Sequence, residues 1–128
     1  MGMGMEMPER RGADISARLL GLAARAINVA RGLPRDTTGR HIAAQIVRCG
    51  TSGGANYEEA RAAESRADFI HKIGVASKEV RKTIFWLQLV KKCELFEGPL
   101  EDAIAEADEL VAILVSSART ARSNAKSP

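Results

Sequence analysis

The chain has 128 residues, the length of one domain, which is enough to bury a single hydrophobic core without disulfides or bound metals. Apolar residues make up 45%, charged residues 27% and aromatic residues 4%, a globular composition that favours helix over sheet. The net charge of +3 is small, no apolar run is long enough to span a bilayer, and the two cysteines lack metal-ligand spacing.

The N-terminal residues 1–12 contain no continuous apolar stretch, so we expect a disordered tail rather than a signal peptide, and a cytoplasmic protein. A first helix is predicted from Asp14, as N-cap, to Gly32, because apolar residues recur there at spacings of three and four. Arginines recur every seven residues on another side of this helix, at Arg11, Arg18 and Arg25.

The second predicted helix begins at Thr37 or Thr38 and contains three glycines within residues 50–54. Each glycine costs a helix about 1 kcal/mol relative to alanine, so propensity alone indicates a loop. The apolar spacing nevertheless passes through this segment unbroken, from Ile42 to Ala60. We therefore predict one continuous helix to about Ala63, with small residues that let a neighbouring helix approach closely.

The third predicted helix begins after Ser65, whose spacing from Asp68 fits a capping box, and ends near Glu94. The fourth begins near Leu100, after Gly98 and Pro99, and residues 123–128 are expected to be a frayed tail. The fold class is thus all-α, and short connections predict an antiparallel up-down-up-down four-helix bundle over residues 13–122.

The third predicted helix carries large apolar residues around its whole circumference at residues 84–87, whereas a bundle helix needs only one apolar stripe. We interpret Phe85 and Trp86 as an oligomer interface. The alternative is that one of them wraps onto a neighbouring helix of the same chain.

No arrangement of residues supports an enzyme or a cofactor. Ser52 has flanking glycines, as in trypsin-like proteases, but that chemistry needs a His base and an oriented carboxylate on a rigid scaffold. No Gly-Lys-Ser/Thr follows to make a phosphate loop, and neither His41 nor His71 has the Glu three residues earlier that a di-metal bundle uses. We expect no catalytic residue, no metal and no cofactor.

Charge is unevenly distributed along the sequence. Residues 18–48 carry six arginines and one aspartate, residues 66–92 carry seven cations and two acids, and residues 97–109 carry six acids and no cation. The molecule should therefore have basic and acidic regions, which bear on its partners rather than on its fold.

Two polar residues of the second predicted helix, Asn56 and Glu59, lie one turn apart near its inner side. A buried amide or carboxylate costs several kcal/mol unless it is hydrogen-bonded. One interpretation is structural: the two residues take part in an interhelical hydrogen-bond network or in a bond at the helix end. The other interpretation is that they contact a ligand.

Residues 45–60, QIVRCGTSGGANYEEA, resemble the central motif of the 23S rRNA intervening-sequence protein family. Residues 68–76, DFIHKIGVA, are similar to its second motif, and Leu33-Pro34 also fits. The sequence departs from the family pattern at Ala60, where many members have Gly, and at residues 78–80. The resemblance covers about residues 14–118.

The resemblance implies a four-helix bundle, a polar core contact between Asn56 and Glu59, and similarity to the accessory protein of diversity-generating retroelements. That relative is a pentameric barrel that binds nucleic acid and its reverse transcriptase. We therefore expect a non-enzymatic homo-oligomer, such as a pentamer, that binds RNA or DNA and no membrane. Arg11, Arg18, Arg25, Arg40 and Arg48 are the candidate nucleic-acid contacts, and a protein–protein scaffold is the alternative role.

Overall fold

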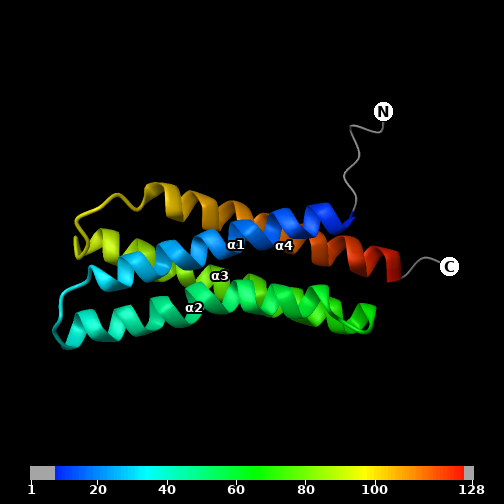
Figure 1. Cartoon of the computed structure of the whole chain (residues 1–128), viewed down its shortest axis with the longest axis horizontal. Helices are drawn as coiled ribbons and strands as arrows, with labels where there is room; N and C mark the ends of the chain where they lie inside the picture. The colour runs from blue at the N-terminus through cyan, green and yellow to red at the C-terminus, as the bar shows by residue number, and fades with distance from the viewer. Residues whose placement is uncertain (1–7, 126–128) are drawn as a thin grey trace.

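Four long helices account for most of the part of the chain that the structure, a computed structural model, describes: residues 8–125. They are α1 (Pro8–Arg31), α2 (Thr37–Arg61), α3 (Arg66–Lys92) and α4 (Glu101–Ala125). The α1–α2 and α3–α4 connections lie at one end of the molecule and the α2–α3 connection at the other (Figure 1). Consecutive helices pack against each other, and no strand occurs in residues 8–125. The predicted all-α antiparallel bundle is confirmed.

Two of the helix starts are capped by side chains of the preceding residue. Asp36 Oδ1 accepts a hydrogen bond from Gly39 N at 2.8 Å, and Ser65 Oγ accepts one from Asp68 N at 3.0 Å. Each bond satisfies one amide that a helix N-terminus leaves without an intrahelical partner. The predicted start of the third helix at Ser65 is therefore confirmed.

The first helix begins earlier than the sequence indicated. Asp14 is not an N-cap but an exposed residue inside α1, which starts at Pro8. Proline fits the first turn of a helix because its missing N–H would have no intrahelical partner there, and only Gly12 weakens the helix before Asp14. Residues 8–12 of the expected tail are thus helical, and residues 1–7 lie outside the described part.

The later helix ends also differ from the prediction by a few residues. α3 ends at Lys92, since Glu94 takes φ 53°, a left-handed conformation that cannot continue a helix. α4 continues to Ala125, so residues 123–125 of the expected frayed tail belong to the helix, and residues 126–128 are not described.

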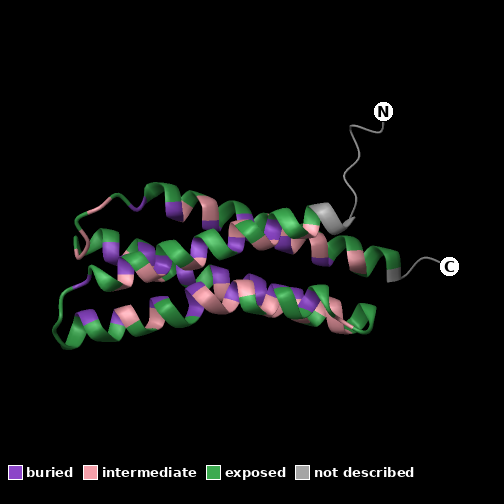
Figure 2. Ribbon diagram, viewed as in Figure 1, coloured by how far each residue is buried: buried purple, intermediate pink, exposed green. Residues whose placement is uncertain are grey.

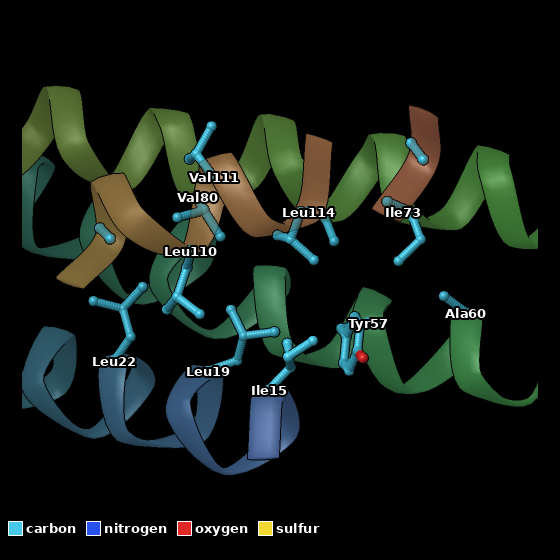
Figure 3. Packing of buried hydrophobic residues seen from close by; sticks show 13 residues of the cluster. Ile15, Leu19, Leu22, Tyr57, Ala60, Ile73, Val80, Leu110, Val111 and Leu114 are labelled. Carbon is cyan, nitrogen blue, oxygen red and sulfur yellow. The ribbon is translucent and has the colours of Figure 1, made fainter. Parts of the chain in front are cut away.

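The apolar stripes of all four helices meet in one long core (Figure 2). At the end that carries the α2–α3 connection, Leu19 and Tyr57 pack with Ile73 and Leu114, one residue from each helix (Figure 3). At the other end, a second cluster contains residues such as Ile46 and Leu87. Both clusters use the three-four spacing read from the sequence.

Helix α2 is continuous through residues 50–54, as predicted. Gly50 lies against Ala26 of α1, where an added Cβ would overlap the Ala26 Cβ. Gly53 lies against Val80 of α3, where an added Cβ would be 2.8 Å from Val80 Cγ2. The glycines therefore let α2 approach both neighbours, and this close packing offsets their unfavourable helix propensity.

Candidate nucleic-acid interface

The side chain of Arg18 on α1 is held by two acids of α4. Its Nε donates to Glu106 Oε2 at 2.9 Å, and its Nη2 donates to Glu106 Oε1 and to Glu109 Oε1, both at 2.8 Å. The hydrogen bonds that Arg18 donates to Glu106 and Glu109 raise the pKa of Arg18, and the one to Glu106 lowers the pKa of that carboxyl. The charge of Arg18 is therefore neutralised within the chain.

Arg25 and Arg11 lie on the same side of α1 as Arg18. Arg25 lines a hollow with Asp102 and Glu106 of α4, and its positive charge also contributes to the lowered pKa of Glu106. Arg11 lines a cleft between α1 and α4 that also contains Glu109. The predicted arginine series of the first helix thus lies on the side of α1 next to α4, where Arg18 is ion-paired and Arg11 and Arg25 are exposed.

Arg40 and Arg48 are exposed on α2 and have no ion-pair partner among the described residues. They do not extend the series on α1, because α1 meets α2 through its other side, with Leu20 and Ala23 next to Thr51. The structure therefore separates the five predicted arginines into an α1 set on the side next to α4 and an α2 set on another side of the bundle.

Further exposed cations lie on α3, for which no nucleic-acid contact was predicted. Lys78 and Arg81 are exposed and, within residues 11–124, have no ion-pair partner, while Lys82 Nζ pairs with Glu79 Oε2 at 3.0 Å. The signal in the sequence was the surplus of cations over residues 66–92. Lys72, Lys82 and Lys91 of this segment form ion pairs, whereas Lys78 and Arg81 have none among the described residues.

Contacts between α2 and α3 bring their outward cations to the same side of the bundle. The Cys49 thiol on α2 interacts with Thr83 on α3, and burial raises the pKa of that thiol. The residues just before this buried pair, Arg48 and Lys82, point outward. Lys78 lies one turn before Lys82. We call Arg48, Lys78 and Lys82 the α2/α3 basic face.

The implied polar core contact between Asn56 and Glu59 is not formed. Asn56 is half-buried and its Nδ2 donates within α2, to Ser52 O at 2.9 Å and to Ser52 Oγ at 3.1 Å. Glu59 is exposed and accepts a hydrogen bond from Lys72 Nζ of α3 at 3.2 Å. Three residues span 300° of a helix turn rather than 360°, and this rotation carries Glu59 out of the interface.

Phe85 and Trp86 have different environments. Trp86 is half-buried, packs against the core, and meets the ring of His41 of α2 edge-on at 5.9 Å between ring centroids. Phe85 is 57% exposed and contacts the Trp86 ring edge-on at 5.1 Å. The alternative interpretation, packing within the chain, therefore describes Trp86, and only Phe85 presents a free apolar surface.

Within the described residues, no group of three or more His, Cys, Asp or Glu side chains is placed to hold a metal ion. None of the described helices is both long enough and apolar enough to cross a membrane.

Comparison with known proteins identifies related sequences and a related fold. The model of the 23S rRNA-intervening sequence protein family matches residues 13–116. A crystal structure of a protein with unknown function from the S23 ribosomal protein family, from Bacteroides thetaiotaomicron VPI-5482, superposes with a TM-score of 0.76. The two sequences are 33% identical, and the match covers 84% of this chain and 97% of that one. No curated protein sequence matches.

Proposed function

This chain belongs to the 23S rRNA-intervening sequence protein family, and from that premise we propose that it is a non-enzymatic accessory protein that binds the phosphate backbone of nucleic acid. We propose that the α2/α3 basic face contacts the phosphates, and that the chain forms a homo-oligomer in which several such faces act together.

One observation carries the proposal: the cations of the bundle differ in whether an acid neutralises them within the chain. The acids of α4 neutralise Arg18 and face Arg25, whereas Arg48 and Lys78 remain exposed without an ion-pair partner in the described part of the chain. Cations that are not committed to internal ion pairs are available to replace the counterions of a phosphate backbone. Such contacts position nucleic acid without reading its sequence.

Fluorescence anisotropy with single-stranded and duplex RNA and DNA, titrated at several salt concentrations, tests this proposal. The variant Arg48→Gln/Lys78→Gln should bind all sequences more weakly. Its log–log salt slope should flatten by about 1.4–1.8, since each phosphate contact contributes roughly 0.7–0.9.

A matched control removes the same amount of charge elsewhere. Arg119 and Arg122 are exposed on α4 and have no ion-pair partner among the described residues, so Arg119→Gln/Arg122→Gln should leave the slope unchanged. An equal loss in both double variants would show non-specific attraction to net charge. No binding by the wild-type protein at low salt would leave the protein–protein scaffold as the role.

A further inference from the structure

A groove with almost no charge runs along the outside of the bundle between α1 and α2. It has a volume of about 670 Å³ and is lined by small or apolar residues of both helices, such as Leu20, Ala23, Ile27 and Gly54, with Glu58 as the one charged residue. Leu20 is 72% exposed, and Val47, one helical turn before Thr51, is 39% exposed. The solvent side of a bundle helix is normally charged, so this surface has the composition of a contact site.

The chain carries a side chain suited to such a groove on a different helix. Phe85 on α3 is the third large apolar residue that is exposed in the described part, after Leu20 and Val47. Arg81 lies one turn before Phe85 and has no ion-pair partner among the described residues. Because α3 packs on α2 and α4, Phe85 cannot reach the α1/α2 groove of its own chain.

We propose that Phe85 of one chain inserts into the α1/α2 groove of a second copy, with Arg81 placed against Glu58 at the groove. Glu58 is exposed and has only a long ion pair, 3.6 Å, with Arg61 in its own helix, so its carboxylate can accept a second cation. The apolar contact supplies most of the free energy, because an aromatic side chain buries a large area.

Charge distinguishes this pairing from the symmetric alternatives. If α3 met α3 of a second copy, Lys78, Arg81 and Lys82 of both chains would oppose each other. If groove met groove, Phe85 would stay in water and the two Glu58 carboxylates would share one interface. A contact between two different surfaces is heterologous, and repeated copies then close into a ring or extend as a filament.

The docking rests on the proposed function in one respect, since that function requires a homo-oligomer that repeats the α2/α3 basic face. The docking is nevertheless tested without nucleic acid, by measuring the solution mass of the full chain. The chain mass is 13.8 kDa, and the wild type should sediment as a multiple of it. Leu20→Glu places a carboxylate in the groove, and Phe85→Glu replaces the inserting side chain. Each variant alone should therefore sediment as a monomer.

Mixing supplies the decisive outcome. Leu20→Glu keeps Phe85, and Phe85→Glu keeps the groove, so an equimolar mixture should form a species of two chains at a concentration where each alone is monomeric. Thr120→Glu adds the same charge to the exposed surface of α4 and should keep the wild-type mass. Helical circular dichroism should be unchanged in all three variants, since both apolar residues are largely exposed.

Three results would overturn the docking. A monomeric wild type excludes it, a full-size Phe85→Glu variant shows that the groove meets some other surface, and a mixture that stays monomeric shows that the two surfaces do not meet. None of these results bears on the salt slope of the monomer, so the failure of the docking and the failure of nucleic-acid binding are distinguishable.

Discussion

Arg18 illustrates how a position read correctly from the sequence can have a different role in the fold. The seven-residue spacing of Arg11, Arg18 and Arg25 places them on one side of α1, as expected. That side faces α4, where Glu106 and Glu109 accept three hydrogen bonds from the Arg18 guanidinium. A bidentate, half-buried pair of this kind stabilises the bundle rather than binding a partner.

The pair predicts an acid-sensitive contribution to stability. Because the hydrogen bond from Arg18 lowers the pKa of Glu106 below 4.5, the folded chain binds fewer protons at this group than the unfolded chain. The stabilisation is therefore complete above pH 4.5 and is lost as the pH falls through the lower folded-state pKa. Glu106→Gln should lower the free energy of unfolding at pH 7 by about 1 kcal/mol and weaken its acid dependence.

Urea unfolding followed by circular dichroism between pH 7 and acid measures both effects. Glu97→Gln is the control, because Glu97 is exposed and has no ion-pair partner among the described residues. If both variants unfold alike at every pH, the contact of Glu106 with Arg18 makes no net contribution.

At the scale of elements, α2 shows tertiary packing prevailing over local propensity. Its three glycines within residues 50–54 favour a loop on their own, yet α2 is continuous from Thr37 to Arg61. The spacing of apolar residues predicted this continuity. Residues that recur every three or four positions on both sides of a segment can all face the core only if the backbone between them stays helical. The glycines then let α1 and α3 approach closely at the middle of α2.

Two alanine substitutions in helix interiors should have opposite signs for this reason. Gly50→Ala should destabilise the protein by roughly 1 kcal/mol or more, because the new Cβ overlaps Ala26 and the helices must separate. Gly74→Ala in α3 should stabilise it by about 0.5–1 kcal/mol, since no neighbouring side chain or other helix lies within 4 Å of the added Cβ. Thermal or urea unfolding compares them directly, and a stabilising Gly50→Ala would contradict the close approach.

At the scale of the whole molecule, the bundle separates its surface chemistry by side. On the α1/α4 side Arg18 pairs with two acids, the α1/α2 side holds the groove, and the α2/α3 side holds the basic face. Docking through the groove repeats the α2/α3 basic face in every copy, with Lys78 and Lys82 beside the docked Phe85 on the same side of α3. Weak phosphate contacts on several copies would then act together through their high effective concentration.

This arrangement predicts that assembly and nucleic-acid affinity are coupled. Leu20→Glu, which should release monomers, should weaken binding to a long oligonucleotide by about 10²-fold or more through lost avidity. Its affinity for a short oligonucleotide that reaches only one chain should match that of Thr120→Glu, which adds the same charge. Anisotropy with both lengths measures this, and equal losses on both would show that Leu20 acts on the binding face itself.

The sequence by itself determined the number, order and approximate bounds of the helices, the continuity of α2 and the cap at Ser65. These features depend on periodicity and on residues within one or two turns of each other, so they are encoded locally. The start of α1 was missed because Asp14 suits a cap equally well, and only the observed helix from Pro8 distinguishes the two starts.

Only the tertiary structure decided which charges remain available and which apolar residues stay exposed. Arg18 and Glu106 are 88 residues apart, so no spacing rule reveals their contact. The same holds for Glu59 with Lys72, for Trp86 with His41, and for the groove that α1 and α2 form together. A helical pattern fixes the side on which a residue lies, whereas its charge balance and exposure depend on what the neighbouring helix brings opposite it.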